Sequence, residues 1–203
     1  MAQKQSTQAV HAGEPRPKPY GAVTTPIIQT STYTFSDSAE IIKFMQAKKL
    51  DTTTLRDEYG RYSNPTQTVV EDKLAVLERT ETALLFSSGM SAITTTLSTL
   101  LSQGDHLVLV DGCYHRTREF TATYLSRWGI ETTTVPIDDP IAWEAAIRPS
   151  TRVIYAETPT NPYLRTIDLD GLASLAKSKG LTTVLDSTFA TPINLRPVEF
   201  GID

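Results

Sequence analysis

A short run of small and polar residues, Ser87 to Ser91, has the composition of an anion-binding turn. The apolar run Ala83 to Phe86 before it predicts a strand, and helical spacing of apolar residues follows it. At such a junction, free backbone N–H groups and the helix dipole favour a phosphate. Ser88, Gly89 and Met90 are therefore candidate phosphate ligands. A tight turn without a ligand is the simpler interpretation of this run taken alone.

Asp186 and Tyr114 follow two other predicted strands. Asp186 ends an apolar run, where a carboxylate is costly unless it meets a cation. A protonated pyridine nitrogen is such a cation, and holding that proton makes pyridoxal phosphate (PLP) an electron sink. The ring of Tyr114 could stack on a planar cofactor. The alternatives are a helix cap or turn residue for Asp186 and an ordinary packed ring for Tyr114.

Two loops carry further candidate ligands. In the run Tyr59 to Thr66, Arg61 can bind a phosphate through two parallel hydrogen bonds, and Tyr59 lies two residues before it. In the run Glu157 to Pro162, the amide of Asn161 can meet a ligand oxygen. A solvated loop and a rigid loop without a ligand are the respective alternatives.

The elements that position these residues alternate along the chain from Asn64 onward. The apolar patterns predict strands and helices in turn, among them strands at 106–110, 130–135, 152–157 and 181–186 and helices at 117–128 and 169–179. This order predicts an α/β domain with a mainly parallel sheet, whose ligands bind beyond the carboxyl ends of the strands. The polar residues expected at those ends are Ser87, Ser88, Asp111, Glu157 and Asp186.

The first 62 residues differ from the rest. Residues 11–30 are rich in proline, which predicts extended, irregular backbone. A short helix is expected after Ser36, with Ile41, Ile42 and Met45 facing inward. We therefore predict an N-terminal arm at 1–62 and a cofactor-binding α/β domain at 63–203. The arm either wraps a neighbouring subunit or forms a surface loop of its own subunit.

Composition excludes several classes of function. The chain has 203 residues, a net charge of −4 and no long basic run, which disfavours nucleic-acid binding. No apolar stretch approaches the length needed to cross a bilayer of about 30 Å. The single cysteine, Cys113, fits a reducing compartment, and His and Cys lack metal-ligand spacing. A cytoplasmic protein without a metal is expected, and the absent glycine fingerprints disfavour a nucleotide-binding module.

Taken together and in order, these motifs resemble one family, the PLP-dependent enzymes of cysteine and methionine metabolism. The resemblance extends from about Thr7 to Asp203 and rests on five motifs: Y-G-R-Y-S-N-P-T, S-S-G-M-S-A, D-G-C-Y, E-T-P-T-N-P and D-S-T-F-A-T-P. It implies the large domain of a fold type I PLP-dependent transferase, similar to aspartate aminotransferase, with an extended N-terminal arm. It also implies a homotetramer built from dimers that share active sites.

The resemblance assigns a role to each candidate residue. Tyr59 and Arg61 match residues that bind the PLP phosphate of a neighbouring subunit, and Gly89 and Met90, beside Ser88, match the phosphate-binding turn. Tyr114 matches the residue that stacks on the ring and handles protons. Asn161 matches a residue near the phenolic oxygen of PLP, and Asp186 matches the partner of its pyridine nitrogen. Thr188 matches a residue that lies beside the ring.

The sequence departs from the family pattern in two places. Ser187 stands where the family usually has asparagine, a small polar exchange that should preserve binding. The sequence also ends at Asp203, before the S-x-T-K segment that carries the Schiff-base lysine and before the C-terminal domain. We therefore expect these 203 residues alone to be inactive, as a fragment or as one piece of a split protein.

The run Cys113 to Arg118 resembles the C-Y-R-x-T-R pattern of cystathionine γ-synthases, where Arg116 could bind an anionic leaving group. A solvated arginine at a helix start is the alternative for Arg116. The expected reaction is γ-replacement on an O-activated homoserine by cysteine, giving cystathionine for methionine biosynthesis. Cystathionine β- or γ-lyase, methionine γ-lyase and O-acylhomoserine sulfhydrylase activities are the alternatives.

Overall fold

The computed structural model describes residues 4–50 and 57–203. The chain divides into two compact units, residues 1–77 with 81–85 and residues 78–80 with 86–203. Among the described residues, no helix is long and apolar enough to cross a membrane.

The first unit contains few regular elements, as its proline content predicts. They are α1 (Gln5–His11), a 3₁₀ turn (Pro19–Gly21), α2 (Ser38–Lys49) and most of α3 (Pro65–Glu78). Asn64 caps α3 as expected, because its side-chain oxygen accepts a hydrogen bond from the backbone N–H of Thr66 (2.8 Å). The expectation of an extended arm also covers residues 1–3 and 51–56, which lie outside the described residues.

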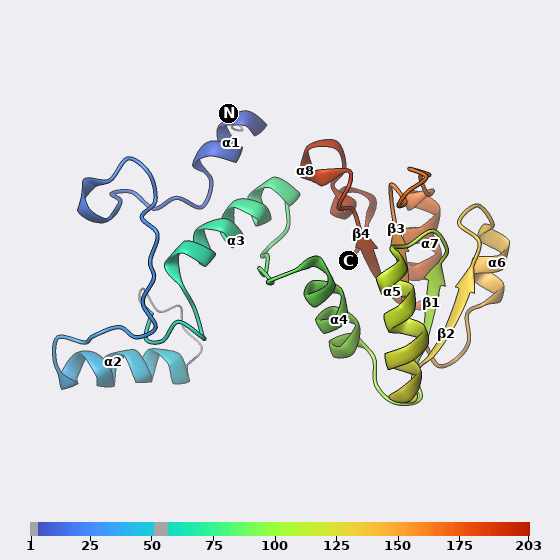
Figure 1. Ribbon diagram of the computed structural model, residues 1–203, viewed down its shortest axis with the longest axis horizontal. Helices are drawn as coiled ribbons and strands as arrows, with labels where there is room; N and C mark the ends of the chain where they lie inside the picture. Colours follow the sequence, from blue (N-terminus) through green and yellow to red (C-terminus); the bar gives the residue numbers. More distant parts are fainter. Residues whose placement is uncertain (1–3, 51–56) are drawn as a thin grey trace. The chain divides into compact units, whose positions relative to one another are not determined.

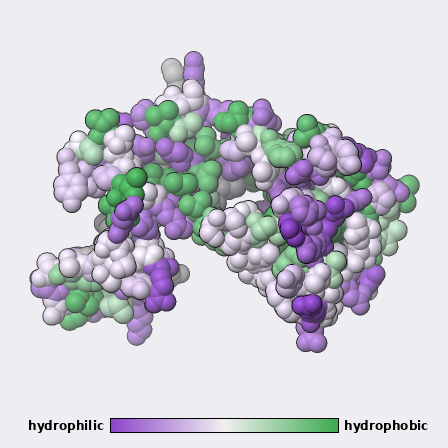
Figure 2. Space-filling view, viewed as in Figure 1, coloured by the Kyte–Doolittle hydropathy of each residue, from purple (hydrophilic) through white to green (hydrophobic). Residues whose placement is uncertain are grey.

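The predicted inward face of α2 is wrong for this unit. Ile41, Ile42 and Met45 are 44%, 57% and 52% exposed, and the buried residue of the helix is Phe44. The ring of Phe44 packs edge-on against Phe35, with 5.4 Å between ring centroids. The helix therefore packs through one aromatic ring, and Figure 2 shows hydrophobic side chains left at the surface over it.

The second unit is built around four parallel strands in the order β2-β1-β3-β4, which confirms the predicted α/β class (Figure 1). Its elements in chain order are α4 (Gly89–Leu100), β1 (His106–Val110), α5 (His115–Phe120), a π-helical segment (Thr121–Leu125), β2 (Glu131–Val135), α6 (Pro140–Ala145), β3 (Thr151–Glu157), α7 (Leu169–Lys179), β4 (Thr182–Asp186), α8 (Thr191–Asn194) and a 3₁₀ turn (Pro197–Phe200).

Helices cover both faces of this sheet, as buried parallel strands require. Along β1, Leu107 and Leu109 join a core cluster with Leu97 of α4, while Val108 and Val110 join the cluster that contains residues of α6 and α7. Burying each such side chain stabilises the fold by about 1.5–3 kcal/mol. These two cores hold the strands in register, and the carboxyl ends of the strands therefore have fixed positions.

One predicted strand is absent. Residues 83–86 are extended but pair with no strand in the described part of the chain, and Leu84 is 73% exposed. The backbone N–H of Leu85 instead donates to the side chain of Glu71 (2.8 Å). An apolar run becomes a strand only where a neighbour completes the hydrogen-bond ladder. The Ser87–Ser91 turn therefore joins an extended segment, rather than a strand, to α4.

Candidate functional site

A cavity of about 360 Å³ lies at the carboxyl ends of the strands, a volume typical of small-molecule sites. It collects residues from four separate segments of the second unit. Its lining consists of Ser88, Gly89, Met90, Ile93, Tyr114, Glu157, Asn161, Asp186, Thr188 and Phe189. Sequence-predicted site residues from the second unit, apart from Arg116, thus line one cavity.

The first turn of α4 gives the cavity an anion-binding end. The hydroxyl of Ser88 accepts from the backbone N–H of Ser91 (3.0 Å) and caps the helix. Within the described chain, no acceptor meets the backbone N–H of Gly89 or Met90. A Cβ added to Gly89 would meet nothing within 4 Å, so the protein's own packing leaves this space open. Free donors, the helix dipole and open space together fit a phosphate group.

Asp186 gives the cavity a fixed negative charge. One carboxylate oxygen accepts hydrogen bonds from the backbone N–H (3.0 Å) and hydroxyl (2.6 Å) of Thr188. Among the described residues, no Lys, Arg or His nitrogen forms an ion pair with Asp186. Asp186 also stands in register with Glu157 on the adjacent strand. Two neighbouring carboxylates beside an open cavity favour a cationic ligand group.

Tyr114 is held at the cavity by its backbone. Its N–H donates to the carboxylate of Glu157 (2.6 Å), and its ring meets the His115 ring edge-on, with 4.6 Å between centroids. Two residues earlier, Gly112 has φ +91°, and a Cβ there would lie only 2.9 Å from a methyl carbon of buried Thr160. The loop that carries Tyr114 therefore packs directly against the loop that carries Asn161.

Glu157 is the residue that sequence reasoning placed at a strand end without assigning it a role. Its side chain is buried, with 6% exposed, and lines the cavity. Burial raises the pKa of this carboxyl above its ordinary value, and the Asp186 charge adds to the rise. Hydrogen bonding to the backbone of Tyr114 and of Asn161 opposes it.

Tyr59 and Arg61 belong to the first unit and are not among the lining residues. The Arg61 guanidinium lies 4.7 Å from the centroid of the Tyr59 ring, within the range of a cation–π contact. Tyr59 also forms an isolated antiparallel bridge with Thr32. The two side chains thus form a local pair, and their assignment to a phosphate stays a prediction.

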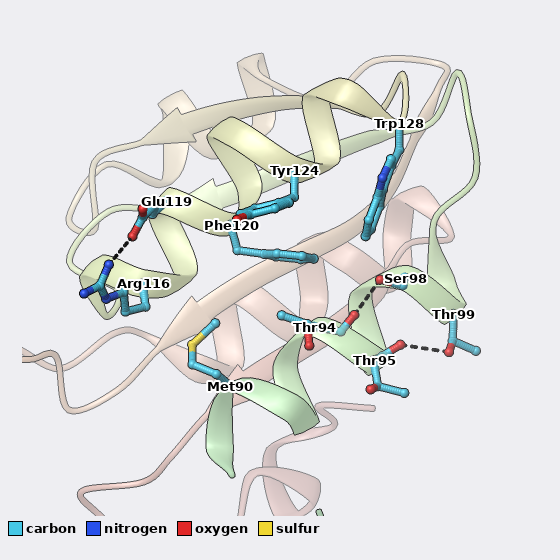
Figure 3. A pocket seen from close by; sticks show the side chains of 10 residues that line it. All are labelled: Met90, Thr94, Thr95, Ser98, Thr99, Arg116, Glu119, Phe120, Tyr124 and Trp128. Carbon is cyan, nitrogen blue, oxygen red and sulfur yellow. Dashed lines mark hydrogen bonds and ion pairs between the residues drawn. The ribbon is translucent and has the colours of Figure 1, made fainter. Parts of the chain in front are cut away.

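Arg116 lines a different and larger hollow, of about 810 Å³, between α4 and the helix that begins at α5 (Figure 3). Its guanidinium pairs with Glu119 (2.7 Å) at one end of this hollow. Phe120 and Tyr124 stack on one wall, with 6.0 Å between their ring centroids. Met90 lines both the hollow and the cavity. The substrate-binding role of Arg116 therefore also stays a prediction.

Comparison with known proteins decides the family. Residues 6–203 match the model of the Cys/Met metabolism PLP-dependent enzymes. The chain belongs to this family. Its cofactor is accordingly PLP, and the first turn of α4 and the Asp186 carboxylate of the cavity fit that molecule's anionic and cationic ends.

Three relatives illustrate how similar this chain is to known proteins. It is 39% identical to cystathionine γ-synthase 1 of Nicotiana tabacum, over 96% of this chain and 36% of that protein. It is 41% identical to L-methionine γ-lyase of Fusobacterium nucleatum, over 97% of this chain and 49% of that protein. The chain also superposes, with a TM-score of 0.90 and 28% identity, on a Campylobacter jejuni structure provisionally assigned as an O-acetylhomoserine (thiol)-lyase. That structure was solved with N'-pyridoxyl-lysine-5'-monophosphate, and the match covers 100% of this chain and 48% of the other.

The chain therefore spans between about a third and about half of the length of these relatives.

Among the described residues, no group of three or more His, Cys, Asp or Glu side chains is arranged to hold a metal ion.

Proposed function

We propose that the full-length protein catalyses γ-replacement on an O-activated homoserine, with cysteine as the incoming thiol and cystathionine as the product. The observation that carries this proposal is the single cavity that joins Asp186, Tyr114 and the first turn of α4. The similarity to tobacco cystathionine γ-synthase supports the choice of reaction. Bound PLP would supply an electron sink for carbanions next to the amino group.

Six of the lining residues have distinct tasks in this proposal. The backbone N–H groups of Gly89 and Met90 bind the phosphate, and Asp186, oriented by Thr188, keeps the pyridine nitrogen protonated. The Tyr114 ring covers one face of the cofactor, and its hydroxyl moves protons to and from the substrate. The Asn161 amide donates to the phenolic oxygen of the cofactor.

Arg116 is proposed to bind the anionic leaving group of the activated homoserine. Its pairing with Glu119 joins two side chains that are 58% and 53% exposed, so exchanging that partner for a substrate anion costs little. A phosphate or succinate leaving group suits a guanidinium, which binds such anions through two parallel hydrogen bonds. We expect Arg116→Gln to raise KM for an anionic substrate more than for O-acetylhomoserine.

Tyr59 and Arg61 are proposed to reach the phosphate of a neighbouring subunit in a homotetramer of site-sharing dimers. Subunit mixing tests this proposal. Full-length Arg61→Ala and Asp186→Ala proteins should each be inactive, and refolding them together should restore activity, because one site of each mixed dimer then has both native residues. Mixtures that stay inactive despite forming mixed dimers would contradict shared sites.

The reaction is tested by supplying the full-length enzyme with O-succinylhomoserine or O-phosphohomoserine plus cysteine, and separately with cystathionine or methionine. Formation of cystathionine is the expected result. The second candidate is C–S lyase activity, which the 41% identity to methionine γ-lyase supports. Release of 2-oxobutyrate or pyruvate without any synthesis of cystathionine would favour the lyase and reject the synthase.

A further inference from the structure

We propose that Glu157 is a positioning residue of the cofactor site, whose ionised carboxylate ties the loop carrying Tyr114 to the loop carrying Asn161. It acts through these two neighbours, which are assigned to different tasks: Tyr114 covers the ring of the cofactor, and Asn161 binds its phenolic oxygen. The inference rests on the proposed assignment of this cavity to PLP and is independent of the choice of substrate.

The first argument is the geometry of the carboxylate. Glu157 is the last residue of β3, and its carboxylate oxygen accepts from the Tyr114 N–H at 2.6 Å, across a separation of 43 residues. The backbone of Asn161, four residues further along the chain, also stabilises the ionised form. Because Glu157 itself begins the loop that leads to Asn161, its hydrogen bond to Tyr114 joins the two loops, and its removal would free each loop from the other at this point.

The second argument is that the fold gains little from this charge. No Lys, Arg or His nitrogen pairs with Glu157 within the described residues, although burying an unpaired carboxylate is costly. The groups that face it from adjacent elements are Asp186 on β4, Arg118 on α5, the Cys113 thiol before α5 and the Tyr155 hydroxyl on β3. Of these, only the Arg118 guanidinium lowers the pKa of Glu157.

The sign of the pH effect separates positioning from folding. The pKa of Glu157 is higher in the folded protein than the ordinary value of 4.5, so the folded state binds the proton more tightly than the unfolded state does. Stability is therefore lost as the pH rises from about 4.5 through the folded pKa. A neutral Glu157→Gln side chain avoids this loss at neutral pH but accepts the backbone hydrogen bonds more weakly.

The experiment compares four full-length proteins by PLP titration of the apo form and by thermal unfolding of the apo form. They are the wild type, Glu157→Gln, Glu157→Asp and the control Glu131→Gln. Glu131 pairs with Arg148 at the other edge of the sheet and is 74% exposed.

Glu157→Gln should keep or raise the unfolding midpoint while weakening the binding of PLP about tenfold, equivalent to about 1.4 kcal/mol. Glu157→Asp, which keeps the charge, should recover part of that affinity, and Glu131→Gln should leave the affinity unchanged and lower the unfolding midpoint at most slightly.

The pH dependence of PLP affinity is the second readout. The wild type should lose affinity as the pH falls through the pKa of Glu157, which burial holds above its ordinary value of 4.5, and Glu157→Gln should lack that part of the decline. The proposal would be overturned if Glu157→Gln bound PLP with the affinity and pH profile of the wild type. It would also be overturned if Glu157→Gln had a lower unfolding midpoint and an unchanged affinity for PLP. Asp186→Asn in the same titration separates the role of Glu157 from the assignment of the cavity to PLP. If Asp186→Asn binds PLP like the wild type, the cavity itself is wrongly assigned. If Asp186→Asn binds PLP weakly and Glu157→Gln does not, only the role of Glu157 is refuted.

Discussion

The two edges of the parallel sheet both carry buried polar side chains, yet their hydrogen bonds go to different places. At the amino-terminal edge, His106 is fully buried, and its two ring nitrogens bond to the hydroxyls of Thr151 and Thr133 at 2.8 Å each. At the carboxyl edge, Asp186 and the first turn of α4 line a cavity, and within the described chain no acceptor meets the backbone N–H groups of Gly89 and Met90.

This difference separates polar groups that serve the fold from polar groups that await a ligand. A buried donor or acceptor without a partner costs about 1–3 kcal/mol, so the hydrogen bonds of the buried His106 ring serve the fold, whereas the α4 turn, which begins at exposed Gly89, leaves its N–H groups open to water or a ligand. At the amino-terminal edge, both ring nitrogens of His106 are satisfied within the protein, so substitution of His106 should act through stability. The carboxyl edge should respond through cofactor affinity.

The largest expected effect is on PLP affinity in Asp186→Asn. Loss of the negative charge opposite a buried cation costs about 2–5 kcal/mol, or roughly 30-fold or more in the dissociation constant. Titration of the full-length apo protein with PLP measures it. Asp111→Asn is the matched control, because Asp111 follows β1 at the same edge, faces Arg118 at 3.7 Å and lies outside the cavity. Equal weakening in both variants would show that overall charge, and not Asp186, is responsible.

His106→Leu should show the opposite pattern, a stability loss of about 1–3 kcal/mol with unchanged PLP affinity. Burial, with the Arg148 charge, lowers the pKa of His106 below 6.5, so the unfolded state binds more protons than the folded state. The stability from neutral His106 is present above about pH 6.5 and is lost as the pH falls through the folded pKa. Thermal unfolding of the apo protein at pH 7.5 and at lower pH measures both effects.

In His106→Leu, acidification should therefore cost less stability than in the wild type. His11→Leu is the control, because His11 is exposed, and it should change stability by less than about 0.5 kcal/mol at either pH. Weakened PLP binding by His106→Leu would break the proposed division between the two edges.

Gly89→Ala should separate stability from affinity at a single position. A Cβ there meets no protein atom, so the apo protein should be as stable as the wild type or up to about 1 kcal/mol more stable. The added methyl group occupies the space proposed for the phosphate, and PLP should bind roughly tenfold more weakly. Gly180→Ala is the counterpart: at φ +66° it should cost about 1–2 kcal/mol of stability and leave the affinity unchanged. Tight PLP binding by Gly89→Ala would place the phosphate elsewhere.

The smallest effect is expected for Arg148→Met. Arg148 forms an ion pair with Glu131 in which both side chains are largely exposed, and such pairs contribute about 1 kcal/mol or less. Its loss should leave PLP affinity unchanged and lower the unfolding midpoint only slightly. A change in PLP affinity of more than a few-fold would show that the two edges of the sheet are coupled.

The sequence predicted the second unit well, because β1 and β3 are mostly apolar runs and α7 has a clear helical pattern with a glycine at its end. The helix predicted at 169–179 is α7, and Gly180 ends it in a left-handed conformation. The strands predicted at 106–110, 152–157 and 181–186 agree with β1, β3 and β4 to within a residue. The residues at their carboxyl ends followed from this order, since parallel strands end at one edge.

Three features could not be predicted, because they depend on partners distant in sequence. The run 83–86 is as apolar as a strand, but no local pattern shows that it lacks a neighbour. The spacing of apolar residues in α2 does not reveal that Phe44 alone is buried. The contact of Glu157 with the Tyr114 backbone joins two strand ends that only the folded sheet brings together.

The register between β3 and β4 places Glu157 directly beside Asp186. Because side chains alternate along a strand, a shift of one residue in either strand would turn that strand's carboxylate toward the face that α6 and α7 cover. Insertions and deletions inside these two strands are therefore incompatible with the site, even where they would leave an apolar sheet intact. The loops beyond Asn161 and Thr188 have no such restriction, and differences in length among homologous sequences should be concentrated there.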